Sequence, residues 1–414
     1  MGQQATKIVV LGGGYAGVIA ALRLAGKTRQ LDAEITLVNG LDHFVERLRL
    51  HELAMGQAIR QPPLAKMVRG TAVNFLHGWA TAIDPEIQTV CVTTGDGGQT
   101  LPYDFLIYAL GSLIEQRVPG VVEHAYLLDP FGERSARALQ TRLAQLAPVD
   151  TVLVVGGGAT GIEAACEIKA HYPQMAMKLV SSGAVGSFKG TRVQRHMLTA
   201  LAEQGITLLE NSRVETVHEA GVTLSDGRFL PAAVTVWCGG FQVPGLAHAA
   251  GLPVNRQNQL LVDPFLRSTA CATIYAVGDA ACPVDDPGTP MRMSLFVALV
   301  TGALAADNIT AVLRYKNQKP LSFATYGQAV SLGPNDAVGF NTFPGDRPFG
   351  PMLRRKTAVY LRRFFVWLLF AFLQIERRLP GFFFWLGRGR FTRQQRKLKR
   401  KGTAVAPSKQ VGYE

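Results

Sequence analysis

Two glycine-rich turns constrain the fold of this chain more than any other feature. The first lies in KIVVLGGGYAG at residues 7–17, and the second lies in TVLVVGGGATGIEAA at residues 151–165. Each follows an apolar run, opens a helix-compatible run and has the spacing Gly-x-Gly-x-x-Gly, the context in which this pattern binds a dinucleotide. Two complete copies predict two dinucleotide sites. One cofactor is expected to be a flavin and the other a nicotinamide, since two nicotinamides would have nothing to pass electrons between.

The glycines of such a turn have separate roles. Gly12 allows the tight turn, Gly14 lets the backbone approach a pyrophosphate, and Gly17 lets the helix pack closely on the strand. Free N–H groups at the helix start are then available to the phosphates. The predicted cofactor-binding residues of the two turns are Gly12, Gly14, Tyr15, Ala16 and Gly17, followed by Gly156, Gly158, Thr160 and Gly161.

The strand after each turn is expected to end in an acid that holds the adenine ribose. Asn39 stands there in the first half, and Ser181 and Ser182 stand there in the second. An amide or hydroxyl still bonds a ribose, and the missing acid in the second half permits a 2′-phosphate. Lys189 and Arg192 could pair with that phosphate or could simply be solvated, so NADH and NADPH both stay open.

Three further segments make the pattern more specific: YDFLIYALGS at 103–112, VTVWCGG at 234–240 and TIYAVGDAA at 273–281. With both turns, this order resembles the FAD- and NAD(P)-dependent pyridine nucleotide-disulfide oxidoreductases, which include type II NADH dehydrogenases and apoptosis-inducing-factor-like enzymes. The resemblance covers roughly residues 7–340. It implies that Asp279 binds the ribityl or phosphate portion of FAD. The other cofactor-binding residues that it implies are Ala80, Gly111 and Gly239.

The acceptor is less well defined by these motifs. GIEAACEIKAHYP at 161–173 and SLGPNDAVG at 331–339 resemble the ferroptosis-suppressor branch, which reduces quinones. Bacterial type II dehydrogenases carry two glutamines at their quinone pocket, where this chain has Phe296 and Val300. Ala298 and Gly302 remain as in those enzymes. The resemblance therefore implies a quinone acceptor and a pocket at Phe296 and Ala298.

Glu163 is the candidate catalytic residue, since it lies two positions after Gly161 and could face the nicotinamide and the flavin. The resemblance ties a glutamate at this position to nicotinamide binding and to coupling with quinone. The alternative is a carboxylate that only stabilises a helix N-terminus.

The segment HFVERLRLHEL at 43–53 has two interpretations. Arg47 could neutralise the flavin pyrophosphate or its reduced ring, and His51 could relay protons to a quinone. Alternatively, the segment is an amphipathic helix with Phe44, Leu48 and Leu53 inward and its charges outward. We favour the second interpretation for His51 and leave Arg47 open.

The five cysteines are scattered, with no CxxC spacing. This pattern indicates a reducing compartment and argues against a disulfide framework, a dithiol redox centre or a zinc cluster, so no metal site is expected. Cys166 and Cys238 are predicted to be small core residues.

The net charge of +13 comes from the C-terminal part of the chain. Fifteen of the 43 Lys and Arg residues lie between 351 and 401, against the single acid Glu376. The same region holds RRFFVWLLFAFLQIERR at 362–378 and GFFFWLG at 381–387. Basic residues beside bulky apolar side chains favour an anionic membrane surface.

The apolar block at 364–375 would form ~18 Å of helix against ~30 Å of hydrocarbon, so it is expected to lie in the interface without spanning. Trp367 and Trp385 suit such an interface. We expect a peripheral protein on the cytoplasmic side of a membrane, bound through residues 362–401, with no signal peptide. The alternatives are docking of the first block on the protein body, a soluble ferredoxin- or rubredoxin-like partner, and nucleic-acid binding by the tail at 388–401. No specific nucleic acid is expected, and an oligomer remains open.

The predicted fold class is α/β, with two Rossmann-like dinucleotide-binding domains and a C-terminal membrane-associating extension. The chain should contribute residues 1–120 and 245–330 to the FAD domain and residues 121–244 to the NAD(P)H domain. Residues 331–414 form the C-terminal region.

Overall fold

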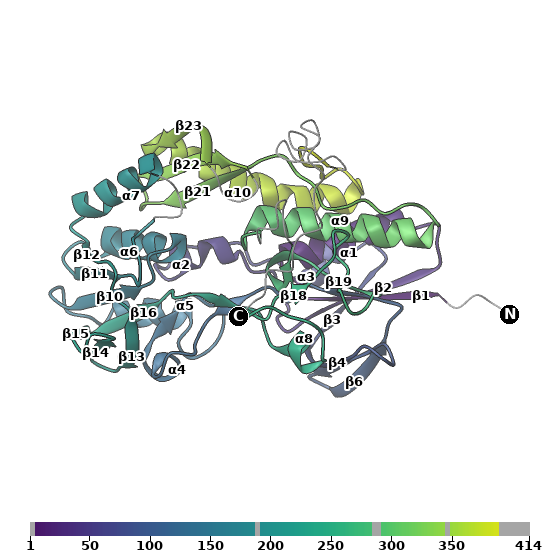
Figure 1. Cartoon of the computed structure of the whole chain (residues 1–414), viewed down its shortest axis with the longest axis horizontal. Helices are drawn as coiled ribbons and strands as arrows, with labels where there is room; N and C mark the ends of the chain where they lie inside the picture. The colour runs from purple at the N-terminus through teal and green to yellow at the C-terminus, as the bar shows by residue number, and fades with distance from the viewer. Residues whose placement is uncertain (1–4, 187–190, 284–290, 344–347, 389–414) are drawn as a thin grey trace, which may run out of the picture.

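The computed structural model of the chain describes residues 5–186, 191–283, 291–343 and 348–388. Two parallel sheets lie at opposite ends of an elongated molecule, and one long C-terminal helix runs past both (Figure 1). The predicted α/β class is confirmed. Lys189 and the basic tail beyond residue 388 lie outside the described residues.

The first sheet has five parallel strands in the order β19-β7-β1-β2-β3. Its central strand β1 holds the apolar run before the first glycine turn, and its last four residues are buried in the first hydrophobic core, as expected for a parallel sheet that is covered on both faces. The strands are Ile274–Ala276, Phe105–Tyr108, Thr6–Leu11, Ala33–Asn39 and Val73–His77.

The second sheet repeats this arrangement around the second glycine turn. It has five parallel strands in the order β12-β11-β10-β16-β9. In each sheet the strand before the glycine turn is central, so both turns lie at the carboxyl ends of neighbouring strands. The strands are Thr207–Leu209, Ala176–Val180, Thr151–Val155, Val234–Trp237 and Tyr126–Leu127.

Smaller antiparallel sheets complete the two halves. Strands β8 and β17 pair with each other where the chain enters and leaves the second half. The three-stranded sheets are β4-β5-β6, β13-β14-β15 and β21-β22-β23. Strands β18 (Leu260–Leu261) and β20 (Ala281–Cys282) form a short parallel pair. In chain order, the antiparallel strands β4, β5, β6, β8, β13, β14, β15, β17, β21, β22 and β23 are Trp79–Asp84, Thr89–Thr94, Gly97–Pro102, Leu113–Ile114, Val214–His218, Gly221–Leu224, Phe229–Pro231, Phe241–Gln242, Tyr326–Ser331, Ala337–Thr342 and Pro348–Arg354.

The helices connect these strands. Helix α9 packs along α1, and the contact is close because a Cβ on Gly302 would lie 2.3 Å from the carbonyl oxygen of Ala16. The α-helices α1 to α10 are Tyr15–Lys27, Leu50–Leu53, Leu64–Val68, Val121–His124, Ala136–Leu143, Ala159–His171, Thr191–Glu203, Leu246–Ala249, Leu295–Leu313 and Arg355–Arg378. In the described part of the chain, short 3₁₀ turns comprise Arg47–Arg49 and Gly278–Ala280.

Two hydrophobic cores follow the two parallel sheets. The first core contains residues from 8–109 and 243–326, and the second contains residues from 50–55, 114–238 and 330–340. The predicted domain boundaries remain a prediction, but the described C-terminal part clearly contributes to the first core. Leu373, Phe383 and Trp385 are buried there.

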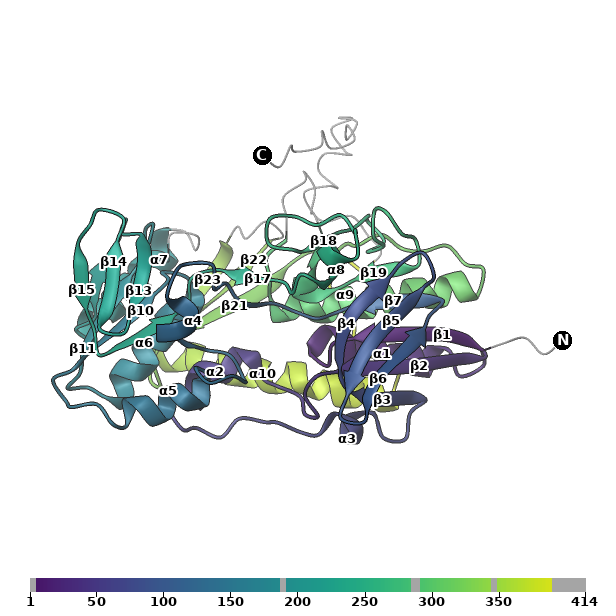
Figure 2. The same cartoon turned by 90° about the horizontal axis from the view of Figure 1, so that it is seen from below.

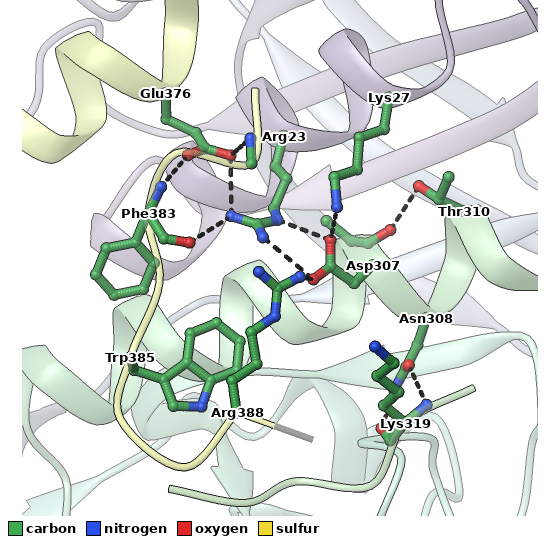
Figure 3. Close-up of polar contacts among 12 residues, drawn as sticks. Arg23, Lys27, Asp307, Asn308, Thr310, Lys319, Glu376, Phe383, Trp385 and Arg388 are labelled. Atoms are coloured by element: carbon green, nitrogen blue, oxygen red, sulfur yellow. Dashed lines mark hydrogen bonds and ion pairs between the residues drawn. The ribbon is translucent and has the colours of Figure 1, made fainter. Parts of the chain in front are cut away.

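A buried ion cluster fastens the C-terminal part to α1 and α9 (Figure 3). The side chains of Arg23 and Glu376 are both fully buried, and Arg23 Nη1 lies 3.0 Å from Glu376 Oε1. Arg23 Nε also donates to Asp307 Oδ1 over 2.8 Å, and Nη1 donates to the carbonyl oxygen of Phe383. Backbone N–H groups of Gly381 and Phe383 donate to the Glu376 carboxylate. Every charge in this cluster therefore has partners, as burial requires.

Asp307 is shared by further cations. Lys27 and Arg388 both pair with its carboxylate. Burial alone would raise the pKa of Asp307, but the hydrogen bond and charge of Arg23, together with Lys27, hold it below the ordinary value. The chain beyond α10 is thus tied back to the first core.

The C-terminal part differs from the sequence prediction in two respects. Helix α10 runs from Arg355 to Arg378, so it is long enough by itself to cross a membrane and the argument from a short apolar block was wrong. Trp385 is 4% exposed and its Nε1 donates to the carbonyl oxygen of Ser322, so its predicted place at a membrane interface was also wrong. The indole is held by the first core instead.

Two helices in the described residues pass the length and composition test for a membrane span, α9 and α10. The apolar window of α9 is 67% buried, which marks it as a core helix, whereas that of α10 is 22% buried. Figure 2 shows α10 running along one side of the molecule next to α2. One side of α10 packs against α1 and the β21-β22-β23 sheet, and the other side is exposed.

Replacing Glu376 tests the buried cluster. In Glu376→Gln, an amide replaces a carboxylate that faces Arg23 and two N–H donors, so we expect the free energy of unfolding to fall by about 3 kcal/mol. Urea unfolding followed by far-UV circular dichroism measures the change. Glu123→Gln, on an exposed position of α4, is the matched control and should leave the midpoint unchanged. Equal urea midpoints for the two variants would contradict a stabilising role of Glu376 in the buried cluster.

Candidate active site

The first glycine turn has the geometry of a pyrophosphate site. Gly12 has φ +109°, and a Cβ there would lie 2.2 Å from the carbonyl oxygen of Ala109. A Cβ on Gly17 would lie 1.8 Å from the carbonyl oxygen of Gly12. Beside Gly14, however, a Cβ would meet no atom within 4 Å. Glycine is thus required by packing at two positions, while the third leaves open space at the start of α1.

The second turn repeats each of these relations. Gly156 has φ +125°, and its Cβ would lie 2.6 Å from the carbonyl oxygen of Cys238. A Cβ on Gly161 would lie 1.9 Å from the carbonyl oxygen of Gly156, and one on Gly158 would meet nothing. Neither helix start has a side-chain cap or an acid in its first turn. Both starts therefore leave N–H groups free for phosphate oxygens.

The residues beside these glycines differ in accessibility. Tyr15 and Ala16 are buried, and Thr160 is half-buried in the first turn of α6. The Tyr15 hydroxyl is buried and has no hydrogen-bond partner among the described residues. The Tyr15 ring packs edge-on against Phe44, so this hydroxyl is enclosed by the segment before α2.

The residues at the strand ends support the turns directly. Asn39 Oδ1 accepts a hydrogen bond of 2.7 Å from the N–H of Gly13, and its Nδ2 donates to the carbonyl oxygen of Leu41. Ser181 lies against the second turn, where a Cβ on Gly157 would be 2.3 Å from its Oγ. An amide and a hydroxyl thus hold the loops in place, with further hydrogen-bonding capacity for a ribose.

The structure leaves the phosphate partner of the second site open. Ser182 follows Ser181 at the end of β11, Arg192 is exposed on α7, and Lys189 lies outside the described residues. The choice between NADH and NADPH thus receives no geometric support from these residues.

Asp279 lies in the 3₁₀ turn after β19. Its Oδ2 accepts a hydrogen bond of 2.8 Å from Ser112 Oγ, and burial raises the pKa of its carboxyl above the ordinary value. The preceding Gly278 has φ +65° and contacts α1 and α9, since a Cβ there would lie 3.0 Å from Ala16 Cβ and 3.5 Å from Ala298 Cβ. Asp279 thus directly follows a glycine that lies against Ala16 and Ala298. Its role in binding FAD stays a prediction.

The remaining predicted cofactor residues line strand ends or connectors. Gly111 has φ +70° and open space where a Cβ would be, while Gly239 lies against the Trp237 ring. Ala80 is half-buried in β4. Arg47 Nη2 donates to Asp129 Oδ1 over 3.2 Å, so it joins the segment before α2 to a loop of the second half. The roles predicted for these residues remain predictions.

The segment 43–53 is not an outward-facing amphipathic helix. Leu48 is 40% exposed, whereas Glu46 and His51 are 0% and 5% exposed. Burial of Glu46 is possible because Arg49 and Arg60 both pair with its carboxylate. The interpretation of His51 as a solvated surface residue was therefore wrong, although Phe44 and Leu53 are buried as expected.

Glu163 faces His51 and the C-terminal helix. Its Oε1 accepts a hydrogen bond of 2.9 Å from the N–H of Ser331 and lies 3.5 Å from Arg362 Nη2. Burial lowers the pKa of His51 despite the charge of Glu163, so its imidazole is neutral at neutral pH. Sequence reasoning missed Ser331 and Arg362, because both are distant from the glycine turn along the chain.

The predicted quinone-pocket residues lie at the start of α9. The Phe296 ring stacks on Tyr326, with centroids 5.6 Å apart, and its edge approaches Phe323. Ala298 lies two residues further on, beside Gly278. The two residues thus connect the surroundings of Asp279 with an aromatic cluster.

The cysteines do not form a redox pair. All five lie in the described part, and none of them is in a disulfide bond. Cys166 and Cys238 are buried, as predicted, and burial raises the pKa of both thiols to about 12. Neither would be a thiolate at neutral pH, so neither is a nucleophile.

The comparisons with known proteins decide the family. A family model described as pyridine nucleotide-disulphide oxidoreductase matches residues 6–301. The chain belongs to this family. An NADH dehydrogenase-like protein of Mycobacterium tuberculosis is 31% identical over 357 residues, which are 80% of this chain and 87% of that protein. A type II NADH:quinone oxidoreductase of Staphylococcus aureus is 23% identical over 88% of this chain and 94% of that protein.

Solved structures show the same fold. The sulfide:quinone oxidoreductase of Aquifex aeolicus has a TM-score of 0.76 at 20% identity, covering 97% of this chain and 96% of that chain. NDH2 of Plasmodium falciparum in complex with NADH has a TM-score of 0.75 at 16% identity, covering 98% and 100%. The predicted family resemblance is confirmed, and the likeness to the ferroptosis-suppressor branch remains a prediction.

As a member of the pyridine nucleotide-disulphide oxidoreductase family, the chain is an oxidoreductase with FAD and NAD(H) as cofactors. When bound, FAD accepts a hydride from the nicotinamide and passes electrons to an acceptor. The residues fit both cofactors. We propose that Gly14 and Asp279 hold FAD, and that Gly158 and Glu163 hold NAD(H).

Gly158→Ala tests the second site with little effect on the fold. The added methyl group meets only open space, and φ −79° suits alanine, so stability and FAD content should not change. Because the methyl group blocks close approach of the pyrophosphate, we expect KM for NADH to rise at least about tenfold, or about 1.4 kcal/mol. The matched variant Gly161→Ala should lower the melting temperature instead. Unchanged KM in Gly158→Ala would exclude this site.

Proposed function

We propose that this protein transfers electrons from NADH to a quinone dissolved in a membrane. The overall reaction would be NADH, a proton and quinone giving NAD⁺ and quinol. The observation that carries the proposal is the exposed side of α10, a helix whose inner side packs on the first core. A lipid-soluble acceptor requires the enzyme to rest on the lipid surface.

The exposed side of α10 is rich in aromatic residues. Tyr360, Phe364, Phe365 and Trp367 are between 45% and 67% exposed. Leu379, Phe382, Phe384 and Leu386, after the helix, are between 43% and 65% exposed. Exposed Arg363 and Arg378 flank these side chains. An aromatic surface bordered by arginines favours the interface between lipid headgroups and hydrocarbon.

The inner contacts favour an interfacial position for α10 over a span. Arg362 and Glu376 lie on α10 itself, and both pair with residues of the protein body. Crossing a bilayer would require these pairs to break and their charges to enter hydrocarbon. We therefore propose that α10 lies parallel to the membrane surface and remains docked.

The relatives support a quinone acceptor without deciding it. The Staphylococcus aureus protein is named a type II NADH:quinone oxidoreductase. The same fold also occurs in an NAD-dependent persulfide reductase of A. fulgidus and a ferredoxin reductase of Rhodopseudomonas palustris, at 22% and 21% identity. Fold alone therefore leaves the acceptor open, and the exposed side of α10 favours the quinone.

The direct test is anaerobic. The flavoprotein is reduced with one equivalent of NADH and then mixed with vesicles that contain a long-chain quinone or with oxidised ferredoxin. We expect the flavin absorbance near 450 nm to recover with the quinone vesicles and not with ferredoxin. No reoxidation by any quinone would refute the proposal, and reoxidation by ferredoxin alone would favour the soluble acceptor.

A double variant locates the contact with lipid. Phe364→Ser with Trp367→Ser should slow reoxidation by quinone vesicles while leaving reoxidation by a water-soluble quinone unchanged. Phe229→Ser, which replaces a 50%-exposed aromatic residue on β15, is the control and should change neither rate.

A further inference from the structure

Arg362 lies where three separate parts of the chain meet. Its Nη1 donates to Glu52 Oε1 over 3.2 Å, and its Nη2 lies 3.4 Å from His51 Nε2. The same Nη2 lies 3.5 Å from Glu163 Oε1. The side chain is only 12% exposed, so this arginine of α10 points inward between α2 and α6.

The contacts of Glu163 come from outside its own helix. The N–H of Ser331, at the end of β21, donates to Oε1, and Arg362 approaches the same oxygen. Glu163 lies in the second turn of α6, directly after the glycine turn of the second site. The direction of its carboxylate is therefore set by β21 and α10.

The charged residues around Arg362 indicate which carboxylate depends on it. Arg49 pairs with both Glu46 and Glu52, so Glu52 has a second cation. Glu167 on α6 accepts a hydrogen bond from Gln57, and burial raises the pKa of its carboxyl. His51 stays neutral at neutral pH because burial lowers its pKa. Among the ion pairs of the described residues, Arg362 is the cation that reaches Glu163.

We propose that Arg362 is a positioning residue that holds the Glu163 carboxylate toward the nicotinamide, so that α10 completes the NADH site. The inference rests on the nicotinamide role proposed for Glu163 and is independent of the acceptor. It assigns α10 a part in flavin reduction in addition to lipid contact. Planar guanidinium groups suit such a task, since one group can contact two carboxylates in fixed directions.

The test is a mutant cycle read by the reductive half-reaction. Flavin reduction by NADH is followed anaerobically at varied NADH, which gives a limiting rate and an apparent Kd without any acceptor. Arg362→Gln should lower the efficiency of reduction at least about tenfold, and Arg362→Lys should restore part of it. Arg354→Gln, at an exposed position just before α10, is the control and should match the wild type.

The cycle separates positioning from a merely structural role. If Arg362 acts through Glu163, the double variant Arg362→Gln with Glu163→Gln should be no slower than Glu163→Gln alone. Additive losses, or a normal rate in Arg362→Gln, would overturn the inference. If Arg362→Gln does not fold, the cycle is run with Arg362→Lys, which keeps the charge. The quinone assay and the mutant cycle can fail separately. If no quinone reoxidises the flavin but the mutant cycle gives the expected result, the quinone acceptor is rejected and the role of Arg362 is retained.

Discussion

The buried pair between Arg23 and Glu376 is the interaction on which the position of the C-terminal helix depends. Arg23 belongs to the helix that follows the first glycine turn, and Glu376 ends α10. The fully buried Glu376 carboxylate depends on the charge of Arg23, while Arg23 also pairs with Asp307. The pair thus fixes α10 relative to the proposed FAD site, and Asp307, from α9, completes the cluster (Figure 3).

This attachment gives α10 two different sides. The inner side carries Glu376 near one end and Arg362 nearer the other, each paired with the protein body. The outer side carries Phe364 and Trp367. Removal of α10 would therefore affect more than binding to a membrane. It would expose Arg23 and would remove the contact between Arg362 and Glu163. A single rigid element links the first core, the proposed NADH site and the surface proposed to contact lipid.

Much of the first part of the fold is predictable from sequence because the glycine turns are local signals. Gly12, Gly17, Gly156 and Gly161 are required by backbone contacts within their own strand–turn–helix units. The family, the two parallel sheets and the buried cysteines followed from such local patterns. The assignment of single residues to FAD or NAD(H) extends these patterns and awaits measurement.

The C-terminal part was predicted less well because its charges were interpreted by composition. Arg362 and Glu376 were assigned to a basic or polar flank, and the charged residues that pair with them are more than a hundred residues away. One local signal was available in the sequence. Spacings of three, four and seven place five residues on one side of a helix: Ala358, Arg362, Leu369, Leu373 and Glu376. Trp385 carried no such signal, since its partner Ser322 belongs to a loop.

Quenching of tryptophan fluorescence by brominated lipids tests the central claim most directly. Of the two C-terminal tryptophans, one is expected to contact lipid and the other to stay buried in the protein. Trp367 is 55% exposed on α10 and Trp385 is 4% exposed in the first core. On vesicles, we expect quenching in the wild type and in Trp385→Phe, and its loss in Trp367→Phe. Quenching that depends on Trp385, or no quenching in the wild type, would contradict a docked helix that rests on the membrane.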